Sequence, residues 1–152
     1  MNDSNYFKKA HSLITNAQKS IYMIMYSAPF YEKYADSPSN LLLKGLTCAA
    51  QKGVDVNVLL DQNDRQEISN SDANKKTARL LEKGGVKVFL DRKNITTHSK
   101  LLIIDARFVV IGSTNWSYHA LTDNNETNVV IDSEKIAGEY IKYFEELKNL
   151  CR

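Results

Sequence analysis

The chain has 152 residues, 43% of them hydrophobic and 25% charged, and a formal net charge of +2 at pH 7. This length suits a single domain with a substantial core, and we expect one domain over residues 1–152. No apolar run approaches the roughly 20 residues of a membrane-spanning helix, so none is predicted. The isoelectric point of about 8.4 neither indicates nor opposes a nucleic-acid partner.

The N-terminal ten residues are polar, and no signal peptide is visible in them. We therefore expect a cytoplasmic location for the sequence as it stands, and a periplasmic or secreted one if a segment precedes Met1 in the natural protein. Cys48 lies in an apolar helical stretch and Cys151 is the penultimate residue. Two cysteines placed in this way predict no disulfide framework.

Helical and strand-like patterns alternate along the first part of the chain. A helical period over residues 5–19 is followed by a dense apolar run at 20–27 that indicates a buried strand. Both prolines fall in the predicted loop at 28–40, and a helix over 39–52 ends at Gly53. The pattern then predicts, in order, a strand at 54–60, a loop at 61–71, a helix at 72–83 and a strand at 86–90.

The second part of the chain begins with a predicted hairpin, with strands at 100–104 and 108–111. A short helix at 116–121, a strand at 127–131 and a helix at 134–150 follow. Strand–helix alternation combined with a hairpin predicts an α/β fold in which helices flank both faces of a mixed sheet.

The predicted hairpin brings together the polar residues on the two sides of its turn. Alternate residues of a strand point the same way, so His98 and Lys100 share a face if the strand begins by residue 98. A turn near Ala106 places Lys100 opposite Gly112. Ser113 and Asn115 then lie beside the pair, and one compact cluster is predicted.

This cluster suits a phosphodiester. Lys100 supplies a positive charge for the non-bridging oxygens, and the Ser113 hydroxyl and Asn115 amide supply neutral donors. Gly112 allows a ligand to approach the backbone. A neutral His98 imidazole can attack phosphorus at neutral pH. These residues are therefore the predicted catalytic and substrate-binding groups.

Three further residues receive predicted roles. Glu126 is the candidate that orients the His98 ring, as the acid of a catalytic triad does. Asp105 lies at the turn end of the hairpin, on the opposite strand parity, and is read as structural. Trp116 is a candidate for stacking on a nucleobase, although a core or rim position explains it equally well.

No metal or other cofactor is predicted. Asp61, Asp64 and Asp91 lie at predicted strand ends, but they lack the tight carboxylate spacing of a metal site. We read them as ordinary loop residues. His119 is expected to be an exposed helix residue, and His11 likewise.

The spacing His-x-Lys-x4-Asp-x6-Gly-Ser-x-Asn, from His98 to Asn115, resembles the signature of the phospholipase D superfamily. The resemblance extends to Glu126, where the family usually carries an acidic residue, and to the general layout of the chain. Its short single-motif phosphodiesterases, typified by a bacterial endonuclease, are the most similar members. The resemblance implies a phosphohistidine intermediate at His98, with Lys100, Ser113 and Asn115 holding the phosphate.

Three functions follow as hypotheses. The first is a metal-independent phosphodiesterase, most simply an endonuclease that cleaves DNA or RNA. The second is hydrolysis or transfer on phospholipid head groups, for which the loop carrying Phe30, Tyr31 and Tyr34 would contact lipid. The third is a nucleic-acid-binding module with little turnover.

The sequence also predicts a homodimer. Once His98 has attacked phosphorus it cannot protonate the leaving oxygen as well, so a general acid is needed. The chain carries the motif once. A two-fold axis beside the site would bring in a second His98, whereas a monomer would have to use another group such as His119.

Overall fold

The structure is a computed structural model that describes residues 4–63 and 70–151. Within these residues six strands form one sheet in the order β3-β2-β1-β4-β5-β6. The strands are β1 (Ser20–Met25), β2 (Asp55–Leu60), β3 (Lys87–Leu90), β4 (Lys100–Ile104), β5 (Phe108–Gly112) and β6 (Asn128–Asp132). The helices are α1 (Ser4–Thr15), α2 (Pro38–Gln51), α3 (Asn70–Lys83), α4 (Tyr118–Thr122) and α5 (Glu134–Leu150).

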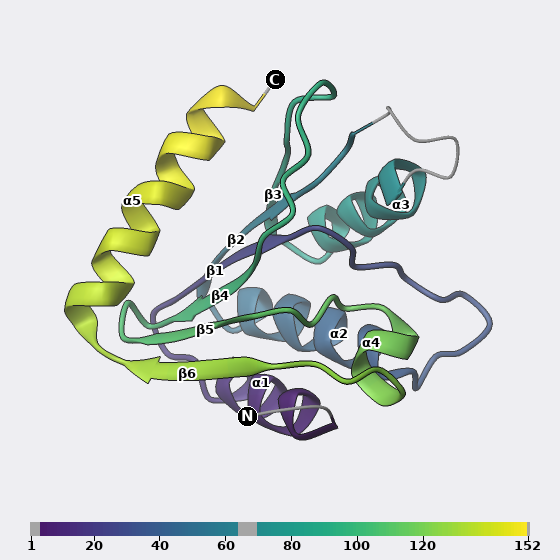
Figure 1. Cartoon of the computed structure of the whole chain (residues 1–152), viewed down its shortest axis with the longest axis horizontal. Coiled ribbons are helices and arrows are strands. Elements are labelled where there is room, and N and C mark those ends of the chain that lie inside the picture. Colours follow the sequence, from purple (N-terminus) through teal and green to yellow (C-terminus); the bar gives the residue numbers. More distant parts are fainter. Residues whose placement is uncertain (1–3, 64–69, 152) are drawn as a thin grey trace.

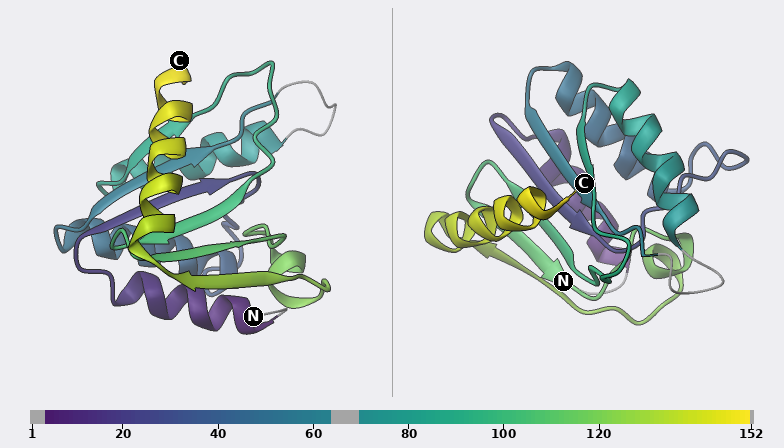
Figure 2. Two further views of the ribbon diagram at one scale, coloured as in Figure 1. Left: turned by 60° about the vertical axis from the view of Figure 1, so that its left-hand side comes forward. Right: turned by 90° about the horizontal axis from the view of Figure 1, so that it is seen from above.

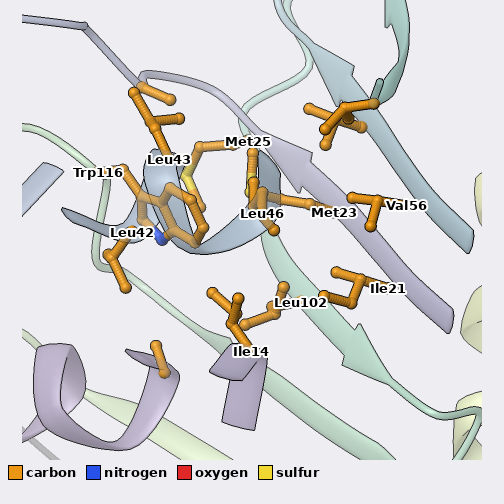
Figure 3. Packing of buried hydrophobic residues seen from close by; sticks show 14 of the residues in the cluster. Ile14, Ile21, Met23, Met25, Leu42, Leu43, Leu46, Val56, Leu102 and Trp116 are labelled. Carbon is orange, nitrogen blue, oxygen red and sulfur yellow. The ribbon is translucent and has the colours of Figure 1, made fainter. Parts of the chain in front are cut away.

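Helices cover both faces of the sheet, as predicted. Figure 1 shows α1, α2, α3 and α4 on one side and α5 alone across the other, and the turned views of Figure 2 keep this arrangement. Each face has its own core. The larger cluster joins Ile14 and Leu42 of the helices to Met23 and Leu102 of the sheet (Figure 3), and the smaller packs Phe144 of α5 against Ile24 and Ile103.

The element ends follow from identifiable contacts. Helix α2 begins after Ser37, whose hydroxyl accepts the Asn40 N–H, and Gly53 follows it with a φ of 92° that an L side chain rarely adopts. Helix α4 begins at Tyr118, two residues later than predicted. Its expected first residue, Trp116, instead donates its backbone N–H to the Ser27 carbonyl (2.9 Å).

The strand directions bring several strand ends to one edge of the sheet. Strand β1 runs parallel to β2 and antiparallel to β4, β2 runs parallel to β3, and β5 pairs antiparallel with both β4 and β6. The carboxyl ends of β1, β2, β3 and β5 therefore meet the beginnings of β4 and β6 at the same edge. In the part of the chain described here, no helix is both long and apolar enough to span a bilayer.

Candidate active site

The hairpin has the predicted register. Leu101 lies opposite Ile111, so the next pair along the ladder is Lys100 and Gly112. Strand β4 begins at Lys100, as predicted. The strand does not reach back to residue 98, so His98 lies in the segment before it. His98 is consequently exposed, while Lys100 is buried at the end of the strand.

The ring of Tyr26, just after β1, brings His98 and Lys100 together. The imidazole and phenol ring centroids are 4.5 Å apart, and the Lys100 Nζ lies 4.9 Å from the Tyr26 centroid. Lys100 also donates a hydrogen bond to the His98 carbonyl (2.7 Å). The Tyr26 N–H donates to the Ser99 carbonyl (3.0 Å), which fixes the tyrosine beside both residues.

Burial and neighbouring charges tune both groups. Partial desolvation of the His98 ring lowers its pKa, the Lys100 charge lowers it further, and Asp61 acts in the opposite direction. Burial also lowers the pKa of Lys100, while Glu126 and Asp61 raise it. The arrangement thus favours a neutral imidazole beside a cation, the state in which His98 is a nucleophile.

Ser113 and Glu126 form the other side of the cluster. The Ser113 hydroxyl donates to the Glu126 carboxylate and accepts the Thr127 N–H (3.1 Å). The Asn124 amide also donates to Glu126 (3.1 Å). The charge of Glu126 raises the pKa of Lys100. The predicted role of Glu126 in orienting His98 remains a prediction.

Gly112 has a packing reason that the sequence did not reveal. A Cβ added there would lie 2.3 Å from the Thr127 carbonyl oxygen and 2.3 Å from the Asn128 Oδ1. The glycine is required because β6 approaches β5 closely, and its predicted role in substrate binding remains a prediction.

Asn115 and Trp116 separate into two environments. The Asn115 Oδ1 is buried, and no hydrogen-bond partner for it lies among the described residues. Trp116 is wholly buried in the larger core, where its indole N–H donates to the Tyr6 hydroxyl (2.8 Å). The assignment of Trp116 to substrate binding was therefore wrong, because no face of its ring is free to stack on a base.

Asp105 is structural, as predicted. Its carboxylate accepts the backbone N–H groups of Gln18 (3.0 Å), Lys19 (2.7 Å) and Ser20 (3.1 Å). It lies with Ala106 in the three-residue connection between β4 and β5, where the φ angles of both residues are positive, 55° and 52°. The residue thereby joins the hairpin turn to the start of β1.

Two of the three aspartates read as loop residues are buried near His98. Asp61 and Asp91 are each 1% exposed, and Asp64 lies outside the described residues. Asp61 accepts the Thr97 N–H (2.8 Å), and Asp91 accepts from the Thr97 hydroxyl. The described residues contain no group of three or more His, Cys, Asp or Glu side chains arranged to hold a metal ion.

Asn74 of α3 joins the segments that follow β1 and β2 by hydrogen bonds. Its fully buried amide donates to the carbonyls of Tyr26 (2.8 Å) and Asp61 (2.9 Å) and accepts the Ala28 N–H (3.1 Å). Sequence reasoning missed Tyr26, Asp61 and Asn74. The first two directly follow apolar strands, a position that could have identified them, whereas a lone asparagine in a polar helix offers no comparable sign.

An open cavity of about 920 Å³ adjoins the segment after Asn115. The loop before α2 and helix α4 line it, with Tyr31, Tyr34, Tyr118 and His119 among its walls. The Tyr118 N–H donates to the Tyr31 hydroxyl (3.0 Å), and His119 is exposed, as expected, with its Nδ1 2.8 Å from Asp123. Phe30, predicted with Tyr31 and Tyr34 as a lipid-contacting lip, instead packs against the core.

The sequence profile for the PLD-like domain of cardiolipin synthase matches residues 11–148. The chain belongs to the phospholipase D superfamily. A mitochondrial cardiolipin hydrolase from Chlamydomonas reinhardtii is 33% identical over 101 residues, which are 66% of this chain and 43% of the relative. A cardiolipin synthase from Staphylococcus aureus is 33% identical over 132 residues, 87% of this chain but 25% of the relative. The chain thus spans less than half the length of either protein.

A solved structure of similar size supports the same membership. The phospholipase D family member Nuc from Salmonella typhimurium is 27% identical and superposes with a TM-score of 0.78, covering 95% of this chain and 88% of Nuc. The superfamily resemblance drawn from the residues between His98 and Asn115, and the α/β fold it implied, are confirmed.

Proposed function

We propose that this chain is a metal-independent phosphodiesterase that cleaves nucleic acid through a covalent phosphohistidine at His98. The observation that carries the proposal is the convergence of His98 and Lys100 on the Tyr26 ring, with Glu126 acting on Lys100 by charge and hydrogen-bonded to Ser113. A neutral nucleophile beside a buried cation suits attack on an anionic phosphodiester.

The reaction proceeds in two displacements. A ring nitrogen of His98 attacks phosphorus, a P–N bond forms, and the P–O bond to the leaving group breaks as that oxygen takes a proton from a general acid. Water then attacks phosphorus, the P–N bond breaks, and the proton of the water passes to the base that the acid has become. Lys100, Ser113 and Asn115 stabilise the charged phosphoryl oxygens in both steps.

The general acid is the second His98 of a homodimer with one active site astride its two-fold axis. His119 is the rival within one chain, since its Nδ1 contacts Asp123 and leaves the other ring nitrogen available. The dimer is preferred because a second copy supplies Lys100, Ser113 and Asn115 to the same phosphate as well.

The cavity between the loop before α2 and helix α4 supports nucleic acid as the substrate. Tyr34 and Tyr118 are exposed at its wall, and tyrosine faces stack on bases of any sequence. The names of the cardiolipin-specific relatives support the second candidate, hydrolysis or transfer on phospholipid head groups.

A panel of substrates tests the proposal. Labelled single- and double-stranded DNA, RNA, and vesicles containing cardiolipin are incubated with the protein in excess EDTA, with His98→Ala as the control. We expect cleavage of a nucleic acid by the wild-type chain only. Mass spectrometry of samples quenched in alkaline denaturant, which preserves a P–N bond, should find His98 carrying the phosphate end of the cleaved strand. Cleavage of lipid alone supports the second candidate, and rescue of an EDTA-inhibited enzyme by Mg²⁺ or Zn²⁺ contradicts the metal-free mechanism.

A further inference from the structure

Asp61 lies outside the motif, yet it is built into the site. It follows β2 directly, at the edge where the catalytic segment begins, and is 1% exposed. Its Oδ1 accepts the N–H of Thr97 (2.8 Å), the residue immediately before His98, and its Oδ2 accepts the Asn63 N–H (3.2 Å). A buried carboxylate is costly unless such donors satisfy it, so this arrangement is specific.

The segment before His98 also contacts a second buried carboxylate. The Thr97 hydroxyl donates to the second buried carboxylate, Asp91 at the end of β3, and the Gln62 amide donates to the Asp91 carbonyl. Asp91 also keeps one buried carboxylate oxygen for which no partner lies among the described residues. The two carboxylates that follow β2 and β3 therefore fix the segment that leads to the nucleophile.

Charge connects Asp61 to both active groups. Its carboxylate acts on His98 and on Lys100, raising the pKa of each. The other titratable groups facing this region are Asp91, which acts on Asp61, and Glu126, which acts on Lys100. The pKa of Asp61 is itself raised by burial, against the lowering effect of its two N–H donors.

We propose that Asp61 is a positioning residue of this active site: its buried carboxylate fixes the Thr97–His98 backbone and supplies the negative charge that sets the protonation of His98 and Lys100. This inference deepens the proposed function, because it assigns pH control of that same site to a residue outside its motif.

Asp61→Asn removes the charge but keeps the contact that positions His98, since the amide oxygen can still accept the Thr97 N–H while the Asn63 N–H loses its acceptor. Without the negative charge His98 and Lys100 both lose their protons at lower pH. We therefore expect both limbs of the pH–rate profile to move to lower pH. Asp61→Ala also removes the acceptor, and we expect it to lose roughly 10²-fold in kcat through displacement of His98.

Asp55→Asn is the matched control. It makes the same substitution at the other end of β2, where Asp55 is exposed and bonded to Lys87 (2.8 Å). Its pH profile and kcat should equal those of the wild type. Circular dichroism of all three variants shows whether each is folded.

An NMR titration of the His98 ring gives a readout that needs no substrate. The chain has three histidines, so His98→Ala assigns the resonance. We expect a lower His98 pKa in Asp61→Asn than in Asp55→Asn. An unchanged His98 titration in a folded Asp61→Asn protein overturns the inference whatever the substrate is. A shifted titration in a protein that cleaves no nucleic acid supports the inference and contradicts the proposed function.

Discussion

Lys100 is a cation that is almost entirely removed from water. Only 7% of the residue is exposed, and its Nζ is held by the His98 carbonyl and the face of the Tyr26 ring. A cation in such a place is stabilised by the ring quadrupole and by nearby carboxylates. An incoming phosphodiester would add a further negative charge where water screens it poorly, which strengthens the attraction.

The His98→Ala and Lys100→Ala variants should each lose on the order of 10³-fold or more in kcat, because they remove the nucleophile and the charge clamp. Initial rates on the substrate found in the panel measure this loss, with thermal unfolding to show that the variants fold. His119→Ala is the matched histidine control and should retain full activity. An inactive His119→Ala protein together with an active His98→Ala protein would show that His98 is not the nucleophile.

The His98–Lys100 hairpin depends at its far end on Asp105, whose carboxylate serves three backbone donors. Asn tolerates a left-handed backbone, so Asp105→Asn tests the carboxylate without straining the turn. We expect the variant to lose about 1–2 kcal/mol in the free energy of unfolding. Its rate per folded molecule should stay close to that of the wild type.

Asp132→Asn is the control for that hairpin, since it removes only the exposed partner of Arg107. An exposed pair contributes at most about 1 kcal/mol, so this change should matter less. Urea unfolding and kcat are measured on both proteins. A fully stable but inactive Asp105→Asn chain would give Asp105 a chemical role and refute the structural one.

The close approach of β5 and β6 makes Gly112 sensitive to the smallest side chain. In Gly112→Ala the new Cβ must displace Thr127 and Asn128, which should cost about 1–3 kcal/mol in the free energy of unfolding. The displacement also separates Ser113 from Glu126, so kcat should fall.

Gly138→Ala is the control, because nothing lies within 4 Å of its Cβ, and it should stabilise α5 by about 0.5–1 kcal/mol. A Gly112→Ala protein as stable and active as the wild type would show that β6 can move away from the added Cβ without cost.

At the scale of elements, the sequence predicted the strands well because their apolar runs are dense and their turns are marked by glycine or aspartate. The hairpin register follows from the turn, and Leu101 does lie opposite Ile111. Contacts between distant segments were beyond local reasoning. The bond from Trp116 to the Ser27 carbonyl delays α4, and the burial of Asp61 depends on Thr97, 36 residues later.

The whole molecule carries one His98, and the proposed mechanism needs two. Solution mass should therefore give a dimer, and mixing experiments decide whether the site is shared. We expect a mixed dimer of a wild-type chain and a tagged His98→Ala chain, purified through the tag, to be nearly inactive, because each reaction needs both histidines.

Two results contradict that expectation. Half of the wild-type activity in the mixed dimer would show that each chain works alone, and full activity of a monomer would do the same. A wild-type dimer carrying the same tag on one chain is the control, since it excludes an effect of the tag. His119→Ala in the active monomer would then identify the general acid.

The burial of Trp116 makes the protein its own fluorescent reporter. It is the single tryptophan of the chain, so all indole emission arises from one known place. Its ring is sealed in the core while its backbone adjoins Asn115 and is tied to Ser27. Emission should therefore be at short wavelength in the folded protein and move to long wavelength on unfolding. Any ligand that shifts the Asn115 segment should alter the intensity without a label, so binding can be followed in the inactive His98→Ala chain.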